Sequence, residues 1–296
     1  MAKILFPMKT TKNMIENAAP HVEKVSRGYL GMSGIGGACG RKLWLGFRWA
    51  KTTRILTPRQ KRIFQRGDIE ESRVIAELKT HGIEVFRKAE DGSEVEIFGI
   101  KGEPQEEFVA CFGHAKGHCD GRARGIPEAP KTTHGLEIKT MASKYWEEFS
   151  NKGLKKSHPV YYAQTQRYMK AMGDVNRFLI IATDKNTEKR EYERIYYDES
   201  FANDLVRKEE EIITSDSPYG RKFPRTDMIC KGVNQDWTCN YYDICHNDVA
   251  PDITCRSCEH SDRAVDGVWL CDLRDDAKVL TMKEQLDACK FYRRAF

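Results

Sequence analysis

Cysteine is unevenly distributed along this chain of 296 residues, because seven of the ten cysteines lie after residue 229. In a short secreted domain such a density indicates disulfide bonds. This chain is long, and its first residues lack the apolar stretch and small-residue cleavage site of a secretory signal. We therefore expect a cytoplasmic protein whose C-terminal cysteines bind metal.

The last four cysteines form a Cys-x-x-Cys knuckle followed by two single cysteines, a pattern typical of structural Zn²⁺ sites. The expected ligands are Cys255, Cys258, Cys271 and Cys289. His260 is an alternative ligand for one of them. We predict that residues 251–296 form a small zinc-binding module after a boundary at Pro251. A docking module for DNA or protein and a purely stabilising clasp are both open interpretations.

The rest of the chain alternates between helical and extended patterns. Helices are expected at 58–80, 142–152, 159–172 and 199–214. Strands are expected at 83–86, 94–100, 108–112, 118–123, 136–140, 177–183 and 191–197, the last two paired with each other. This order predicts a mixed α/β core. The longest apolar run, Phe178–Ala182, is too short to cross a membrane, and no membrane association is expected.

A candidate catalytic centre lies on two of these strands. Glu137 and Lys139 alternate with apolar residues, so both side chains point to one face of their strand. Asp120 lies near the end of the preceding strand, and its carboxylate could meet Glu137 if the strands are neighbours. Carboxylate oxygens suit Mg²⁺ or Mn²⁺, which could activate water for phosphodiester hydrolysis. Taken alone, the three residues are better explained by a surface strand that alternates Glu and Lys for solubility.

Two helices supply further candidates. Gln164 and Tyr168 are four residues apart and share one helix face, from which an amide and a phenol could contact a DNA backbone. In the helix at 58–80, Glu71 follows Gly67 by four residues and could join the metal site. Glu70 is the rival residue for that role.

In chain order, the four motifs are Gly67-x-x-x-Glu71, Asp120, Glu137-x-Lys139 and Gln164-x-x-x-Tyr168. This ordered set resembles the motifs of the PD-(D/E)XK nuclease superfamily, in its RecB-like branch. The resemblance covers residues 60–200 and implies a restriction-endonuclease-like core, a mixed central sheet flanked by helices. It implies that Asp120 and Glu137 are metal ligands and that Lys139 is the catalytic lysine. Gln164 and Tyr168 would be the accessory pair. Branch members often have His where this chain has Glu71, which would be the upstream metal-site residue.

A second cysteine set brackets this core and resembles the iron–sulfur nucleases of the same branch, namely the CRISPR-adaptation exonucleases and the AddB-type helicase-nucleases. The set comprises Cys39, Cys230, Cys239 and Cys245. Four thiolates are what a [4Fe–4S] cluster requires, and here the cluster would tie the ends of a domain spanning residues 1–250. Zinc on the same ligands, or a buried unligated Cys39, are the alternatives. The C-terminal module resembles those attached to some phage-type nucleases.

Together these features predict a metal-dependent DNA exonuclease that acts on linear or single-stranded ends. The resemblance implies recombination, repair or end processing as its setting, in the cytoplasm of a bacterial or phage-infected host cell. It also implies a phage origin and a recombination or single-strand-annealing protein as partner. The net charge of +5 permits a nucleic-acid partner without demanding one. A structure-specific endonuclease and a non-catalytic DNA- or protein-binding module are the alternative functions.

Overall fold

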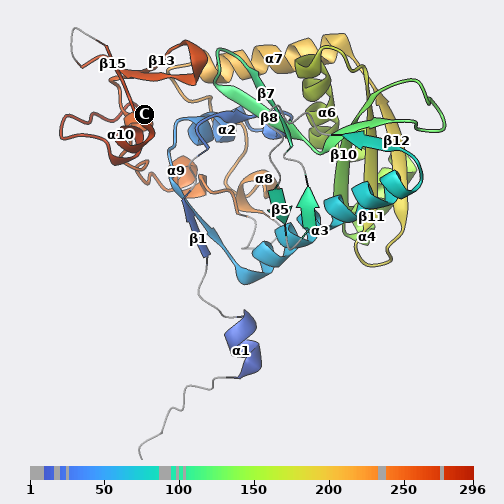
Figure 1. The fold of residues 1–296 in the computed structure, drawn as a ribbon. Coiled ribbons are helices and arrows are strands. Elements are labelled where there is room, and N and C mark those ends of the chain that lie inside the picture. The colour runs from blue at the N-terminus through green and yellow to red at the C-terminus, as the bar shows by residue number, and fades with distance from the viewer. Residues whose placement is uncertain are drawn as a thin grey trace, which may run out of the picture.

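A five-stranded mixed sheet forms one half of the computed structural model (Figure 1). Its strands, in spatial order, are β12 (Arg190–Tyr196), β11 (Arg177–Asp184), β10 (His134–Met141), β9 (Gly121–Arg124) and β4 (Glu84–Phe86). β10 and β11 are parallel, and the other neighbours are antiparallel. The expected mixed α/β class and the expected pairing of the last two strands are therefore confirmed.

The structure describes residues 10–16, 21–24, 27–86, 95–97, 100–102, 105–232, 238–273 and 277–296. The α-helices among them are α1 (Thr11–Glu16), α2 (Gly40–Phe47), α3 (Pro58–Thr80), α4 (Ser143–Lys152), α5 (Leu154–Ser157), α6 (Pro159–Met172), α7 (Glu199–Thr214), α8 (Met228–Lys231), α9 (Tyr242–His246) and α10 (Met282–Asp287). The four helices predicted from the sequence are thus present. No helix in the described part of the chain has the length and apolar character needed to cross a lipid bilayer.

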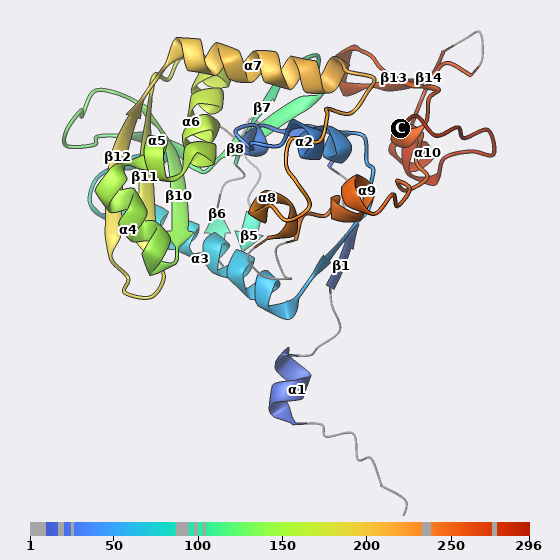
Figure 2. The same ribbon diagram turned by 180° about the vertical axis from the view of Figure 1, so that it is seen from behind.

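Helices cover both faces of the central sheet, and each interface has its own apolar core. On one face, α3 packs against β10, where Leu136 and Ile138 join a cluster that includes Val74 of the helix. The other face carries α4 and α6, with α7 outside α6 (Figures 1 and 2). A Thr57–Gln60 capping box begins α3, which fixes where this long helix starts.

The chain changes sheets at Asp120, so the single strand expected at 118–123 is wrong. Its first part belongs to β8 (Ala115–Cys119), which lies between β2 (Leu30–Gly31) and β7 (Glu106–Ala110) in a separate three-stranded sheet. Its second part is β9 of the central sheet. Asp120 therefore sits where two sheets meet.

Smaller elements complete the fold. They are β1 (His21–Lys24) paired with β3 (Thr53–Leu56), the hairpin β5 (Val95–Ile97) and β6 (Ile100–Gly102), and the short helices η1 (Met32–Gly34), η3 (Cys255–Ser257) and η4 (Val265–Gly267). The strand expected at 94–100 is thus two short strands, and its residues 94, 98 and 99 lie outside the described part. The C-terminal sheet of β13 (Ser261–Arg263), β14 (Trp269–Cys271) and β15 (Lys278–Val279) lies beyond α2 and α9, far from β12 (Figures 1 and 2).

Candidate active site

Five of the predicted site residues come together from three separate segments. Asp120 Oδ2 accepts a hydrogen bond from the Ile138 N–H at 2.7 Å, just beyond the last β9–β10 pair. On β10, the Lys139 ammonium donates to Glu137 Oε1. From α6, Gln164 Nε2 lies 2.8 Å from the same oxygen of Glu137 and 3.2 Å from the Tyr168 hydroxyl.

Local sequence explains this convergence. Alternation along β10 places Leu136 and Ile138 in the core beneath α3 and leaves Glu137 and Lys139 on the α6 face. Pro159 occupies the first turn of α6, and Gly173 ends the helix in the left-handed conformation (φ 72°).

Gln105, which the sequence did not single out, connects Asp120 to Glu71. Its Nε2 lies 2.9 Å from Asp120 Oδ1 and 3.3 Å from Glu71 Oε2. Gln105 directly precedes β7 in a polar stretch, and nothing in the sequence separates it from an ordinary surface residue. The Glu71 carboxylate thus lies on the side of α3 that faces Asp120, and the Gln105 amide bridges the two carboxylates.

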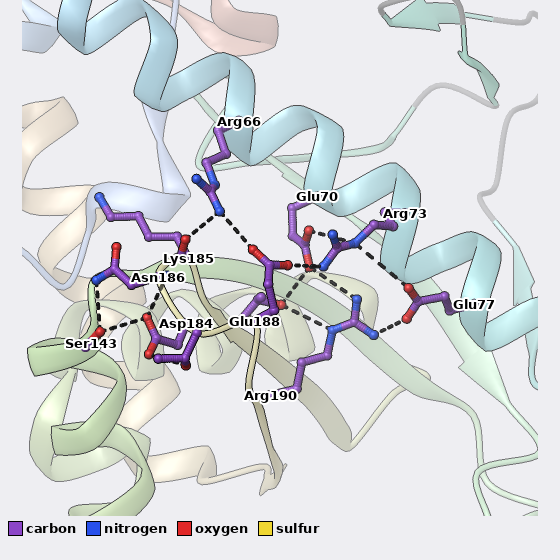
Figure 3. A network of polar contacts seen from close by, with 12 residues as sticks. Arg66, Glu70, Arg73, Glu77, Ser143, Asp184, Lys185, Asn186, Glu188 and Arg190 are labelled. Carbon is purple, nitrogen blue, oxygen red and sulfur yellow. Dashed lines mark hydrogen bonds and ion pairs between the residues drawn. The ribbon is translucent and has the colours of Figure 1, made fainter.

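Glu70 lies in a different environment, an ion-pair network on α3 and the β11–β12 turn (Figure 3). Its carboxylate accepts from the Thr183 hydroxyl at 2.7 Å and pairs with Arg73 and Arg190. Glu188 adds a second carboxylate to Arg73 in the same network. Because Arg73 and Arg190 already neutralise Glu70, its carboxylate serves to hold α3 to the sheet.

Burial sets the protonation of Glu137. It raises the pKa of Glu137 to about 8, with the nearby Asp120 charge acting in the same direction and Lys139 opposing it. Burial lowers the pKa of Lys139, but Glu137 and Asp120 outweigh that effect and raise it above its ordinary value. Lys139 therefore stays protonated. Glu137 also retains a proton near neutral pH, because burial and the Asp120 charge raise its pKa.

The donor set suits a hard divalent cation. Glu137 Oε2 is buried without a hydrogen-bond partner in the described structure, and a cation would supply that partner. Magnesium is commonly held by one or two carboxylates and keeps several waters, which matches the contribution of Asp120 and Glu137. In the described part of the chain, no three His, Cys, Asp or Glu side chains are already placed to hold a metal ion. Recruiting Glu71 would require Gln105 to move.

These residues border an open pocket of about 390 Å³. Its inner wall includes Lys139, Gln164 and Tyr168, with Gln105 beside them. Arg27, Tyr29, Lys116 and His118 also line the pocket, and we call these four residues its outer wall. Lys116 and His118 both pair with Glu107. Basic and aromatic side chains lining one pocket are suited to a phosphate backbone with attached bases.

Metal affinity should rise with pH. Binding a cation requires ionised Glu137, whose pKa is raised to about 8, so below that pH each cation bound releases about one proton. We expect the affinity for Mg²⁺ to rise roughly tenfold per pH unit from pH 6 towards 8 and to level off above. Calorimetric titrations in buffers of different ionisation enthalpy measure both quantities. Glu137→Gln should lose the dependence, and a flat wild-type profile would contradict this account.

Each predicted cysteine set lines its own pocket, but among the described residues neither set is arranged to hold a metal ion as it stands. One pocket, near α8 and α9, is lined by Cys39, Cys230, Cys239 and Cys245. The Cys39 sulfur accepts from the Lys42 N–H at 3.4 Å, and the Cys245 sulfur accepts from Arg41 Nε at 3.3 Å. Donors of this kind stabilise thiolate sulfur. Burial and the three other thiols raise the pKa of Cys230, which shows how closely the set is packed.

The second pocket lies within the C-terminal sheet region. It is lined by Cys255, Cys258, Cys271 and Cys289, with His260 also on its wall. Burial, followed by the other three thiols, raises the pKa of Cys255 to about 12. The remaining cysteines, Cys111 and Cys119, stand apart, and Cys119 is buried in β8.

Comparison with known proteins gives fold-level likenesses alone. No protein-family model matches this chain, and no curated protein matches it significantly. The crystal structure of LHK-Exo, an alkaline exonuclease from Laribacter hongkongensis, aligns at 16% identity with a TM-score of 0.40, over 63% of this chain and 87% of that one. The LHK-Exo complex with dAMP aligns with the same identity and TM-score, over 62% of this chain and 86% of that one. The crystal structure of SSO0001 aligns at 16% identity with a TM-score of 0.41, over 78% of this chain and 90% of that one. The function of this chain is therefore argued from its own site.

Proposed function

We propose that this chain is a divalent-metal-dependent DNA exonuclease of the PD-(D/E)XK type. One observation carries the proposal: buried Asp120 and Glu137 meet Lys139 and Gln164, which line the pocket, and a buried carboxylate oxygen of Glu137 lacks a partner among the described residues. An acidic pair with a lysine against it is the arrangement that phosphodiester hydrolysis requires.

Each residue has a role in this reaction. Asp120 and Glu137 would hold Mg²⁺ or Mn²⁺, which when bound polarises the phosphate and acidifies a water. The Lys139 ammonium would offset the charge that develops on the phosphate oxygens. Gln164 orients Glu137 through its amide and is in turn bonded to Tyr168.

Pocket size favours action at a strand end. A pocket of about 390 Å³ is in the range that holds small ligands, so its size suits a single nucleotide at the end of a strand. Recombination, repair or end processing, in a phage setting with an annealing partner protein, remains the proposed context.

Digestion of linear and covalently closed circular DNA of the same sequence tests the proposal. With Mg²⁺ or Mn²⁺, the wild type should degrade the linear form and leave the closed circle intact. Cleavage of the closed circle would indicate the endonuclease alternative. DNA binding without cleavage of either form, over a range of metals, would overturn the enzymatic assignment in favour of a binding module.

We also propose that the four thiols of Cys39, Cys230, Cys239 and Cys245 hold a [4Fe–4S] cluster. Their common pocket and the donors from Arg41 and Lys42 support the proposal. Protein purified without oxygen should be brown and contain about four iron atoms per chain. Cys239→Ala should lose the iron, whereas the control Cys111→Ala should keep it. Iron-free protein with zinc in this pocket would contradict the cluster.

The C-terminal thiols are proposed to bind Zn²⁺. Cys255, Cys258, Cys271 and Cys289 line one pocket, and four thiolates are a common structural zinc set. Elemental analysis of the same preparations measures this metal, and zinc should be lost in Cys258→Ala and retained in Cys111→Ala.

A further inference from the structure

The outer wall of the active-site pocket is built from two short segments, 27–31 and 115–118. β2 and β8 pair in parallel, with Leu30 beside Ala115 and Gly31 beside Lys116. The side chains of Arg27, Tyr29 and Lys116 line the pocket from this wall. Since β2 has only two residues, other contacts must hold the wall in place.

Arg256, between the two cysteines of the C-terminal knuckle, makes one of these contacts. Its guanidinium donates to the backbone carbonyl of Gly28 at 3.0 Å, to that of Phe47 at 3.3 Å and to Gln285 Oε1 at 2.8 Å. It also lies 3.8 Å from the ring centre of Trp49. A side chain from the C-terminal module thus forms a hydrogen bond with the backbone of segment 27–31 in the pocket wall.

Trp49 fixes the neighbouring residue of the same wall. Its Nε1 donates to the carbonyl of Arg27 at 2.9 Å. The carbonyls of two consecutive residues, Arg27 and Gly28, are therefore held by Trp49 and by the arginine stacked on its ring. This leaves little freedom for the backbone from which the Arg27 and Tyr29 side chains project.

The same module also holds the β8 side of the wall. The Gly267 N–H donates to the carbonyl of Phe112 at 2.8 Å, and the His114 ring nitrogen donates to the carbonyl of Ala264 at 2.7 Å. The carbonyl of His114 then accepts from the Leu30 N–H at 2.7 Å. Both segments of the wall are therefore tied to residues after 251.

The chemistry of Arg256 fits a geometric role. Its side chain is buried, and none of the ion pairs in the described structure includes it. Burying a cation is costly unless it is hydrogen-bonded, and here its three acceptors belong to separate segments of the fold. A planar guanidinium can bond three fixed acceptors at once, which an ammonium or an apolar side chain cannot do in the same geometry.

We propose that Arg256 is a positioning residue for substrate binding: it holds Gly28 directly and Arg27 through Trp49, so that the outer pocket wall meets a single DNA strand. The proposal rests on the proposed nuclease function. It predicts that the C-terminal module affects how tightly DNA is held, through Arg27, Tyr29 and Lys116, while the chemistry at Glu137 and Lys139 is unaffected.

Arg256→Lys tests this role, because it keeps the positive charge and loses the planar fork. We expect a short single-stranded DNA to bind roughly tenfold more weakly, measured by fluorescence anisotropy with Ca²⁺ in place of Mg²⁺. KM for cleavage should rise by a similar factor, with kcat within about twofold of the wild type. Arg293→Ala is the matched control, since this arginine belongs to the same module and is exposed.

Hydrogen exchange supplies a readout independent of DNA. In Arg256→Lys, amides of 27–31 and 112–118 should exchange faster, while those of β11 stay unchanged. Trp49→Phe keeps an aromatic ring and loses the N–H that bonds the Arg27 carbonyl, so it should also speed amide exchange in the wall. This variant replaces Arg256→Lys in the test if Arg256→Lys does not fold. Unchanged exchange in the wall would overturn the proposal. Faster exchange with unchanged DNA affinity would also overturn it, whereas a wild type that neither binds nor cleaves DNA would refute the nuclease function instead.

Discussion

Lys139→Ala is expected to reduce DNA cleavage about 10²–10³-fold without unfolding the protein. The ammonium contacts Glu137 and lies 5.0 Å from the ring centre of Tyr161, at the edge of the pocket. It is the cation placed beside the carboxylate pair where the phosphate would bind. Because the side chain is partly open to the pocket, its truncation leaves no large cavity in the core.

The pH profile gives this prediction a second signature. Removing the Lys139 charge takes away the interaction that opposes the upward pKa shift of Glu137. The residual activity should therefore require a higher pH than the wild type does. Initial rates on end-labelled linear DNA, from pH 6 to 9.5, measure both effects. Lys144→Ala on α4, an exposed lysine outside the pocket, is the control. A Lys139→Ala enzyme with more than about a tenth of wild-type activity would contradict the assigned role.

Glu209→Gln is expected to cost about 3–5 kcal/mol of unfolding free energy. Glu209 of α7 accepts from both Nε (3.0 Å) and Nη2 (2.7 Å) of Arg167 on α6, and both side chains are almost fully buried. The amide would leave the guanidinium in the core without an anion. This pair holds α6, the helix that carries Gln164 and Tyr168, against α7.

Urea and thermal unfolding measure this loss, which should appear as a decrease in Tm of roughly 10 °C. Asp204→Asn is the matched control, because Asp204 pairs with Arg207 on the exposed face of the same helix and should cost under about 1 kcal/mol. A double variant, Arg167→Met with Glu209→Leu, should recover much of the lost stability. Equal effects of Glu209→Gln and Asp204→Asn would show that the buried pair does not fix α6.

Segments with strong periodicity could be predicted from the sequence. Helix α3 and helix α7 match the expected ranges because their apolar residues recur at helical spacing and because caps mark their ends. Alternation along β10 correctly placed Glu137 and Lys139 opposite Leu136. The spacing of Gln164 and Tyr168 likewise predicted that they share a face, and the structure brings both to Glu137.

Other parts of the site depend on contacts between distant segments, which local pattern cannot reveal. The sequence through Asp120 looks like one continuous strand, but β8 pairs with β7 and β9 pairs with β10, so the chain turns from one sheet to another. Gln105 directly precedes β7, and only the fold brings its amide to Asp120 and Glu71. Arg256 lies between two cysteines, and nothing in the local sequence indicates that it is only 1% exposed, with Trp49 and Trp269 stacked against it.

Anomalous diffraction from crystals containing Mn²⁺ tests the central claim most directly. A metal peak should lie within about 2.0–2.6 Å of carboxylate oxygens of both Asp120 and Glu137, and it should be absent in Glu137→Gln crystals treated in the same way. Manganese bound elsewhere in a catalytically active protein, with none at Asp120 and Glu137, would contradict the assignment of this pocket as the hydrolytic centre.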